Sequence, residues 1–586
     1  MTSLMFSPMP SLTHTLAAAA LAAFALAAHA EINLGPYVPV TDARLANPEP
    51  SNWLQYRGNY GGWGYSPLEK INAGNVGKLK LAWSMATGQT DGHQSPPIVN
   101  NGYMYVTTPG AQVIALDASS GIELWRWKKE LPADLMQLHP TNRGVALYGD
   151  KVYMATVDAH LVALDAKTGK VAWDVAVGNS KALQYITLAP LAAKGKIMVG
   201  SSGGETGVRG FVAAYDAVTG KEAWRTYTTA APNEPGGDTW PGDSYKNGGG
   251  SIWITGTYDP ATNLAYWGTG NPAPWPTEGR KGDNLYTTSA IALDVDSGAI
   301  KGHHQYHHND AWDWDEVSAP VLIDTEIKGR KVKAAVHAGR NGYLWMLERQ
   351  PNGKIGFIDA FPYVHNNVFT SIDKTTGRPT YDESHKPGLG KAVSFCPSLW
   401  GGKDWPPEAW NPKTGLFYIP ANNNLCGELP AAETAKYKAG DLYIGYPIEG
   451  VLGSLRYKDD KAPATIGELQ AWDLKTGKMA WVHKFDTFIW APLLTTGGNL
   501  VFTGGTNDRQ FRAFDATNGK VLWQYSMPSG VTAVPTSFEV AGEQYVAVQA
   551  GWGVDAQRMQ SGIDALTGKP KAVPQGGTVM VFKLDK

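Results

Sequence analysis

The chain is poor in cysteine and in charged residues. Its 586 residues include two cysteines and 18% charged side chains, against a usual charged share of about 25%. The net charge of −2 provides no cationic excess that would draw the chain to nucleic acid or to an anionic membrane. The two cysteines allow one disulfide at most, and no Cys-x-x-Cys-His motif for covalent haem attachment occurs.

Long uninterrupted helical segments are also lacking. The 67 glycines and 38 prolines interrupt the chain too often for an all-α protein and are typical of many short strands joined by turns. Hydrophobic residues make up 43% of the chain, which is ample for a core and excludes intrinsic disorder. Tryptophan is abundant, with 22 residues. After the N-terminal region, no stretch is long and apolar enough to predict a membrane span.

The N-terminus has the pattern of a secretory signal. Residues 16–28 are only Ala, Leu and Phe, and they lead into Ala28-His29-Ala30, a small-residue cleavage pattern before Glu31. No Lys or Arg precedes this run, and the alternative is an Ala-rich helix of the mature protein. We predict that residues 1–30 are a signal peptide and that residues 31–586 function outside the cytoplasm, in a compartment where a disulfide can persist.

One short phrase recurs along the chain: Asp, three residues, Gly, three residues and Trp. The Asp and Gly favour a turn, because Asp can cap it and Gly can take positive φ. Strand-like runs lie on both sides of each copy. The full copies are Asp117-Gly121-Trp125, Asp165-Gly169-Trp173, Asp216-Gly220-Trp224, Asp473-Gly477-Trp481 and Asp515-Gly519-Trp523, with partial copies at Asp294-Gly298, Asp373-Gly377 and Asn411-Gly415.

The spacing of these copies predicts a β-propeller. Neighbouring full copies lie roughly 40–50 residues apart, the length of a four-stranded propeller blade. A mature chain of this length predicts seven or eight blades with insertions. A common hairpin is the alternative, and five full copies at blade-like spacing disfavour it. Residues 230–440 carry longer loops rich in Gly, Pro, Trp and Asn, and loops of this kind are where a binding site would be built.

The repeats resemble the tryptophan-docking motif of the eight-bladed quinoprotein alcohol dehydrogenases. These are periplasmic enzymes that use pyrroloquinoline quinone (PQQ) and a metal ion. The resemblance covers nearly all of the mature chain and implies one eight-bladed all-β propeller domain over residues 31–586. It is carried by the segments at 52–72 (NWLQYRGNYGGWGYSPLEKIN), 200–210 (GSSGGETGVRG), 266–275 (YWGTGNPAPW), 309–317 (NDAWDWDEV), 338–349 (AGRNGYLWMLER) and 577–584 (GTVMVFKL).

The resemblance implies a metal site built from oxygen ligands. Glu205 and Asn271 match metal-binding positions, and Asp313 matches the catalytic base that neighbours the metal. Without the resemblance, each would be interpreted as a turn or solvated residue. Asp315 matches a second Asp that is typical of lanthanide-type members, and an added carboxylate suits a trivalent ion, although Ca²⁺ stays possible. If this segment is an extended strand, Asp313 and Asp315 share one face.

The resemblance also implies a set of PQQ-binding residues. Arg143 matches the position that meets a cofactor carboxylate, Trp253 the stacking position, and Arg340 the position near the quinone oxygens. Gln94 stands where the family commonly has Glu, and it keeps the hydrogen-bonding reach without the charge. The remaining matches to cofactor or pocket positions are Thr187, Ser202, Gly203, Gly204, Ser251, Asp404 and Trp490.

The cysteines both agree with and depart from the family pattern. Family members usually carry adjacent cysteines before the NRG motif, but residues 134–144 contain none. Leu138 or His139 is therefore expected to cover that face of the cofactor. Cys396 and Cys426 match the second disulfide of methanol dehydrogenase-like members, with two free buried thiols as the alternative.

The function that the resemblance implies is alcohol oxidation. Asp313 would take the hydroxyl proton, Arg340 would stabilise charge on the quinone oxygen, and hydride would pass to PQQ. The products would be aldehydes from primary alcohols or ketones from bulky secondary ones. Because the chain lacks a haem motif, a separate soluble cytochrome c is the expected electron acceptor. The alternative function is a non-catalytic periplasmic propeller scaffold with similar Trp repeats.

Overall fold

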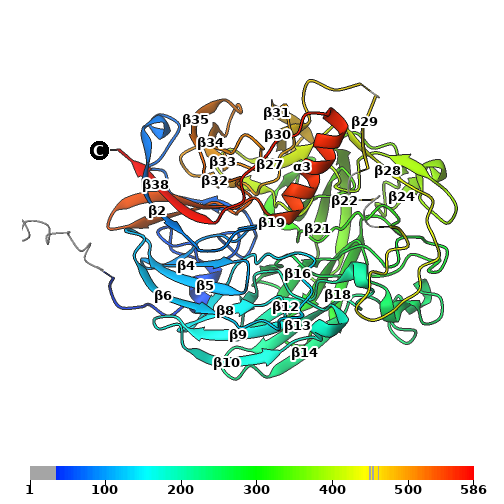
Figure 1. The fold of residues 1–586 in the computed structure, drawn as a ribbon, viewed down its shortest axis with the longest axis horizontal. Helices are drawn as coiled ribbons and strands as arrows, with labels where there is room; N and C mark the ends of the chain where they lie inside the picture. The colour runs from blue at the N-terminus through cyan, green and yellow to red at the C-terminus, as the bar shows by residue number, and fades with distance from the viewer. Residues whose placement is uncertain (1–33, 448–450, 452–453, 460, 586) are drawn as a thin grey trace, which may run out of the picture. The chain divides into compact units, whose positions relative to one another are not determined.

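Strands make up almost all of the regular structure. The computed structural model describes residues 34–447, 451, 454–459 and 461–585 (Figure 1). The predicted signal peptide, residues 1–30, lies outside these described residues. Among the described helices, only α3 (Gly553–Thr567) is longer than two turns. The all-β class is therefore confirmed, and none of the described helices is long and apolar enough to cross a membrane.

Eight sheets of four or five strands follow one another along the described chain. The first four are β3 (Ile98–Asn100), β4 (Tyr103–Thr108), β5 (Gln112–Asp117) and β6 (Glu123–Lys128); β7 (Ala146–Tyr148), β8 (Lys151–Ala155), β9 (His160–Asp165) and β10 (Val171–Ala176); β11 (Leu191–Ala193), β12 (Lys196–Gly200), β13 (Phe211–Asp216) and β14 (Glu222–Tyr227); and β15 (Thr257–Asp259), β16 (Leu264–Gly268), β17 (Ser289–Asp294) and β18 (Ile300–Gln305). In each, the strands are hydrogen-bonded in chain order.

Of the other four sheets, the first also has its strands in chain order, and each of the remaining three includes a strand from a distant part of the chain or a longer insertion between strands. The four are β19 (Val321–Ile327), β20 (Arg330–Ala338), β21 (Tyr343–Arg349) and β22 (Ile355–Pro362); β26 (Ala409–Asn411), β27 (Leu416–Asn422), β30 (Gly467–Asp473) and β31 (Lys478–Lys484); β1 (Tyr65–Ser66), β32 (Leu494–Thr496), β33 (Leu500–Thr503), β34 (Gln510–Asp515) and β35 (Val521–Ser526); and β36 (Thr536–Val540), β37 (Glu543–Ala550), β38 (Thr578–Leu584) and β2 (Leu79–Ala86).

The remaining elements are short and lie in the connections. They are the strands β23 (Phe369–Ile372), β24 (Pro379–Tyr381), β25 (Val393–Phe395), β28 (Leu425–Leu429) and β29 (Leu455–Tyr457), the helix α1 (Asp42–Ala46), and the 3-10 helices η1 (Val76–Lys78), η2 (Ser180–Ala182), η3 (Gly204–Thr206), η4 (Gly237–Thr239), η5 (Ser244–Asn247) and η6 (Glu383–His385). Cys396 and Cys426 lie beside β25 and at the start of β28, and they form the predicted disulfide.

A strand from near the N-terminus and the last strand of the chain meet in one sheet. β2 pairs antiparallel with β38, from Leu79 opposite Leu584 to Ala86 opposite Thr578, and the two strands lie side by side in Figure 1. Burial falls toward the outer strand of each sheet. In the β3–β6 sheet every residue of β5 is buried, whereas the residues of β6 alternate in exposure, as expected for a strand with one solvated face.

Tryptophans of the repeat lie against glycines of the following repeat. Trp125 donates from its indole N–H to the carbonyl of Ala166 at 3.0 Å. A Cβ atom on Gly169, where φ is +69°, would lie 2.6 Å from the Trp125 ring, so only glycine fits there. The last repeat Trp, Trp523, donates to the carbonyl of Leu79 in the first strand of the closing sheet. These contacts join neighbouring sheets.

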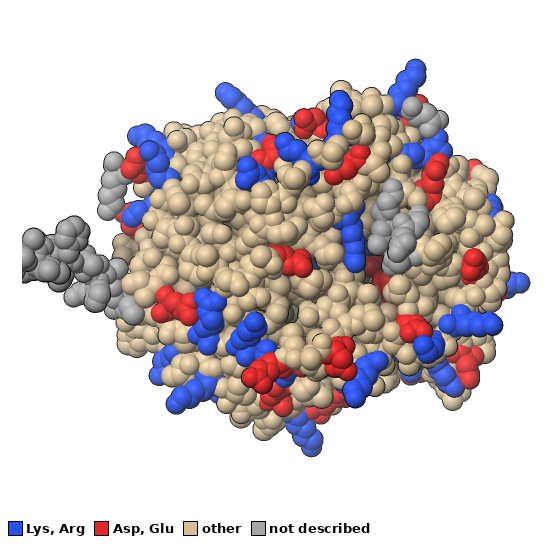
Figure 2. All heavy atoms as spheres, viewed as in Figure 1, with Lys and Arg blue, Asp and Glu red and all other residues tan. Residues whose placement is uncertain are grey.

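The surface carries both signs of charge without a dominant one. On the face shown in Figure 2, basic and acidic side chains are interspersed, and no large area of one sign is present. This distribution agrees with the net charge of −2.

Candidate active site

Loops from several sheets line a pocket with a cavity volume of about 110 Å³. Aromatic and aliphatic side chains form much of its wall, and charged side chains project into it, which is the usual composition of a small-molecule site. Its lining residues are Leu138, His139, Arg143, Tyr185, Thr187, Ser202, Gly203, Glu205, Trp253, Trp275, Asp313, Asp315, Arg340, Leu399, Trp400, Asp404, Trp405, Leu442, Trp490, Asp555 and Arg558.

Arg340 lies between three buried carboxylates. Its Nη2 atom is 3.2 Å from Asp313 Oδ2 and 3.5 Å from Asp404 Oδ2, and its Nη1 atom is 3.6 Å from Asp315 Oδ2. The Arg340 Nε atom also donates to the carbonyl of Leu399 at 2.8 Å. One guanidinium therefore fixes three carboxylates that the sequence separates by up to about 90 positions, through charge-assisted contacts.

The segment that carries Asp313 is a loop, so the expectation of an extended strand over Asp313 and Asp315 is wrong. Asp310 accepts hydrogen bonds from the backbone N–H groups of Trp312, Asp313 and Trp314, at 3.2, 3.1 and 3.4 Å. Asp313 itself adopts φ +62°, a left-handed conformation that is uncommon for residues other than glycine. Both Asp313 and Asp315 still line the same pocket, because this tight loop turns them toward it.

Asp315 also holds two neighbouring residues. Its Oδ1 atom accepts the backbone N–H of Asn271 at 2.6 Å, and its Oδ2 atom accepts the indole N–H of Trp253 at 3.0 Å. A side chain at Gly270 would collide with Asp315 and with Ser251. The close approach of these residues therefore depends on glycine at position 270.

Several buried oxygen atoms near these carboxylates have no hydrogen-bond partner. They are Asn271 Oδ1, Asp313 Oδ1 and Ser251 Oγ. Buried polar atoms usually have a partner, so these three oxygens are free to bind an ion or a ligand in the pocket. In the described part of the chain, no three His, Cys, Asp or Glu side chains converge tightly enough to hold a metal alone. A hard cation here would therefore need the Asn271 oxygen and ligand oxygens besides the carboxylates, and these donors are of the type it prefers.

The crowding of acidic groups has a clear electrostatic consequence. Burial, together with the charges of Asp315 and Glu205, raises the pKa of Asp313 well above its usual range, although Arg340 opposes the shift. Burial likewise raises the pKa of Asp315 to about 7, against the opposing charge of Arg340. A cation bound among these oxygens would lower both pKa values and keep the carboxylates ionised. The site is therefore better suited to hold a cation than to exist without one.

A second part of the pocket combines a cation with flat aromatic surfaces. The Arg143 guanidinium lies 4.9 Å from the ring centre of Trp253 and 4.8 Å from that of Trp405. It donates from Nη1 to Thr187 Oγ1 at 2.6 Å, while its Nε atom has no partner. A buried cation beside aromatic faces suits a flat, polycarboxylated ligand.

The structure brings most of the predicted site residues to this pocket. Arg143, Thr187, Ser202, Gly203, Glu205, Trp253, Asp313, Asp315, Arg340, Asp404 and Trp490 line it. Asn271, Gly204 and Ser251 lie immediately behind these residues: a Cβ atom on Gly204 would be 3.1 Å from Ser251 Oγ and 3.8 Å from Asn271 Oδ1. Gln94 is buried and does not line the pocket, and its side-chain oxygen has no hydrogen-bond partner.

His139, which was expected to cover the cofactor, belongs to a cluster of three titratable residues that the sequence did not predict. His139 Nδ1 lies 2.8 Å from Asp555 Oδ1, and Arg558 Nη1 lies 3.3 Å from the same oxygen. Arg558 also donates to the carbonyl of Leu138 at 3.4 Å. We call His139, Asp555 and Arg558 the clasp, because it joins helix α3 to the segment around His139. Despite burial, the charges of His139 and Arg558 hold the pKa of Asp555 at about 2.

Comparisons with known proteins identify the class to which this β fold and its pocket belong. Residues 53–357 and 365–546 match the family described as "PQQ: Glucose/ethanol/alcohol dehydrogenase, beta-propeller domain". The chain therefore belongs to the PQQ-dependent alcohol dehydrogenase family, and its fold is the β-propeller of that family.

Relatives and solved structures resemble nearly the whole chain. The quinoprotein alcohol dehydrogenase PedH of Pseudomonas putida is 40% identical over 550 residues, which is 89% of each chain. The lanthanide-dependent methanol dehydrogenase of Methylacidiphilum fumariolicum is 36% identical and covers 92% of this chain and 93% of its own. The structure of a europium-containing methanol dehydrogenase superposes with a TM-score of 0.86 at 34% identity, over 93% of this chain and 100% of that one.

Proposed function

We propose that the protein is a PQQ- and metal-dependent dehydrogenase of primary or bulky secondary alcohols. The observation that carries this proposal is the arrangement of Asp313, Asp315 and Asp404 around Arg340, in a pocket that also contains Arg143 and flat aromatic walls. Membership of a dehydrogenase family favours this function over the non-catalytic scaffold. We further propose that the eight sheets are eight blades of one domain over residues 31–586, joined by the Trp–Gly contacts.

The residues fit the cofactor and the metal in different parts of the pocket. Arg143, Thr187 and Trp253 would hold PQQ through a carboxylate contact, a hydroxyl and a stacking surface, with contributions from Gln94, Ser202, Gly203, Gly204, Ser251, Asp404 and Trp490. Glu205, Asn271, Asp313 and Asp315 would hold one metal ion, either a lanthanide or Ca²⁺. PQQ, when bound, supplies the two-electron acceptor, and the metal supplies Lewis-acid polarisation.

The chain's own residues supply the acid–base and electrostatic parts of the reaction. Asp313 Oδ1 has no partner among the described residues and accepts the hydroxyl proton of the alcohol. Arg340 contacts the other oxygen of Asp313 at 3.2 Å, which orients the carboxylate and places N–H donors where negative charge develops. The backbone hydrogen bonds to Asp310 hold Asp313 in its left-handed conformation. The aromatic and aliphatic walls exclude water from the reacting atoms.

Localisation and electron transfer are proposals from the sequence. The Ala-rich N-terminus and the disulfide between Cys396 and Cys426 support secretion to the periplasm after cleavage at residue 30. A separate soluble cytochrome c is the proposed electron acceptor, because the chain lacks a haem attachment motif.

The proposed function is tested by reconstitution of the purified mature chain. Absorption spectra are recorded before and after addition of PQQ with Ca²⁺ or La³⁺, and alcohols of increasing size are then screened by dye-linked reduction. We expect stoichiometric PQQ binding and alcohol-dependent dye reduction that requires both PQQ and metal. If PQQ binds but no alcohol is oxidised, the substrate class is wrong. If PQQ does not bind, the proposed function is wrong.

Replacing Trp253 with Ala should weaken PQQ binding. The substitution removes a large stacking surface worth about 2–3 kcal/mol, which corresponds to roughly a hundredfold in Kd. The measurement is a fluorescence titration of apo-protein with PQQ at saturating metal. Trp173→Phe is the matched control, because Trp173 lies against Gly220 between two sheets and away from the pocket. Equal affinities of wild type and Trp253→Ala would make Trp253 a purely structural residue.

Breaking the clasp should make PQQ dissociate faster. We propose that Leu138 and the clasp cover the cofactor face that other members cover with adjacent cysteines. His139→Ala removes a hydrogen bond to a charged group, worth about 1.5–3 kcal/mol, and an increase of about tenfold or more in the dissociation rate is expected. The rate is measured by dilution into excess apo-protein of a second quinoprotein. Gln557→Ala, on the same helix, is the control, and an unchanged rate in His139→Ala would exclude a covering role.

A further inference from the structure

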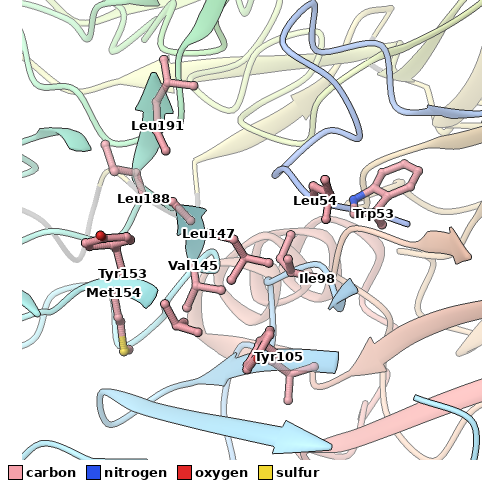
Figure 3. Close-up of a cluster of buried hydrophobic side chains, with 14 of the residues drawn as sticks. Trp53, Leu54, Ile98, Tyr105, Val145, Leu147, Tyr153, Met154, Leu188 and Leu191 are labelled. Atoms are coloured by element: carbon pink, nitrogen blue, oxygen red, sulfur yellow. The ribbon is translucent and has the colours of Figure 1, made fainter. Parts of the chain in front are cut away.

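A second enclosed space lies among the innermost strands, apart from the active-site pocket. Its cavity volume is about 40 Å³, and no lining residue is shared with the active-site pocket. One wall is the segment that begins near Leu54 and runs into β1, and the other walls are the inner edges of sheets around Val145, Leu147 and Leu191. Figure 3 shows these four side chains as part of a buried hydrophobic cluster. Because the wall is mostly apolar, it offers few polar partners to a charged group in this space.

Two charged side chains line this space, Glu408 and Arg57, and the one with unpaired polar atoms is Arg57. Its residue exposure is 6%, and its Nη2 atom donates to the carbonyls of Glu408 and Leu493 at 2.6 and 2.8 Å. Its Nε and Nη1 atoms have no hydrogen-bond partner. Arg57 forms no ion pair with any residue that the structure describes: the nearby Glu408 instead accepts from the backbone of Ala338 and lies 3.6 Å from Lys403.

Burying the Arg57 guanidinium with two nitrogen atoms unpaired is energetically unfavourable. Burial lowers the pKa of Arg57 to about 10, so the side chain is still cationic at neutral pH. A buried cation with unpaired N–H groups costs several kcal/mol unless an anion or water satisfies it. The neighbouring chain nevertheless leaves room for the Arg57 guanidinium, because a Cβ atom at position 64 would collide with it and Gly64 has none.

A second donor faces the same space. Tyr56 lines it, is 5% exposed, and has a hydroxyl group without a hydrogen-bond partner. The other hydroxyl groups of the lining are already used: Tyr60 donates to Ala192, and Thr255 donates to Ala189. The unsatisfied polar groups of this space are therefore hydrogen-bond donors, one of them positively charged, which is the composition of an anion site.

We propose that Arg57 and Tyr56 form a binding site for a small monovalent anion, of the size of a halide, formate or acetate, in the space enclosed by the inner strands. The charge of Arg57 selects an anion over a neutral molecule. The apolar walls around Leu54 and Leu147 disfavour a strongly hydrated dianion such as sulfate, because they offer no further donors to replace its water. This site is distinct from the proposed dehydrogenase site and does not depend on it.

The experiment uses the full mature chain with bromide and acetate as probes. Crystals are soaked in sodium bromide, and anomalous diffraction locates the ion; thermal unfolding is then followed against acetate or sulfate at constant ionic strength. We expect a bromide peak within hydrogen-bond distance of Arg57 Nε or Nη1 and of Tyr56. Because a ligand that binds the native state stabilises it by mass action, Tm should rise with acetate and not with sulfate.

Matched variants separate this site from general salt effects. Tyr56→Phe should raise the acetate Kd about tenfold, since one hydrogen bond to a charged group is lost, and Arg57→Gln should abolish the response. If Arg57→Gln fails to fold, Ala192→Leu fills the same space with Arg57 intact and should also abolish the response. Arg330→Gln, an exposed arginine paired with Glu348, should behave as wild type. Water rather than bromide beside Arg57, or the same acetate response in wild type and Ala192→Leu, would overturn the proposal.

Discussion

The Asp313→Asn variant should lose alcohol oxidation by about 10²–10⁴-fold in kcat, the range that a positioned general base contributes, while it folds normally. The amide keeps an oxygen that can accept from Arg340 but cannot take up the substrate proton. Because the loop is held by backbone hydrogen bonds to Asp310, the substitution should leave its conformation intact. The measurement is dye-linked kcat at saturating PQQ and metal, together with the thermal unfolding midpoint.

Two controls distinguish loss of the general base from loss of bound metal or PQQ and from a general effect of the substitution. Metal content and bound PQQ are measured in the same samples, because Asp313 is also a proposed metal ligand. Asp296→Asn is the matched surface control, since Asp296 is exposed and pairs with Lys194 and Lys196. If fully loaded Asp313→Asn keeps kcat within about tenfold of wild type, below the range of general-base catalysis, another residue is the base.

Local sequence signals predicted the repeated architecture, because each repeat is specified over few residues. The turn at Asp165-Gly169 and the Trp that follows depend on local φ preferences and on one contact with the neighbouring repeat. Local preferences of this kind carry no information about which distant loops meet in the folded protein. Glu205, Asn271 and Asp313 come from different loops, and only the closure of the whole fold brings them together. They were identified by resemblance to a family, and no spacing rule would have grouped them.

The features that the sequence did not predict depend on tertiary contacts. An extended strand would have placed Asp313 and Asp315 on one face, but Asp310 accepts hydrogen bonds from three successive N–H groups of that segment and holds it in a tight loop instead. The clasp was missed because Asp555 and Arg558 belong to a helix inserted between β37 and β38, more than 400 positions from His139. An acidic and a basic residue one helical turn apart would ordinarily be interpreted as a solvated surface pair. Only the packing of α3 onto the pocket gives them another role.

Lanthanide ions should support activity at lower concentrations than Ca²⁺. Glu205, Asp313 and Asp315 place three carboxylates beside one pocket, and burial with mutual repulsion raises the pKa of Asp315 to about 7. A trivalent ion balances three carboxylates, whereas Ca²⁺ leaves excess negative charge. The measurement is activity of apo-protein with saturating PQQ against the concentration of La³⁺ or Ca²⁺.

Removing the Asp315 carboxylate should abolish the lanthanide preference, but the choice of substitution matters because Asp315 has other contacts. Asp315 also accepts hydrogen bonds from Trp253 and from the backbone of Asn271, so Asp315→Ala loosens the stacking residue as well as the metal site. Asp315→Asn removes the charge, keeps the size of the side chain and retains an oxygen acceptor for one of these two N–H groups, so it is a sharper variant than Asp315→Ala. We expect its half-saturating La³⁺ concentration to rise by about tenfold or more, as for the loss of one charge-assisted contact, with the Ca²⁺ value little changed. PQQ affinity at saturating Ca²⁺ should remain at the wild-type value. A wild-type enzyme that works with Ca²⁺ and is silent with every lanthanide would show that Asp315 serves Trp253 and Asn271 and not the metal.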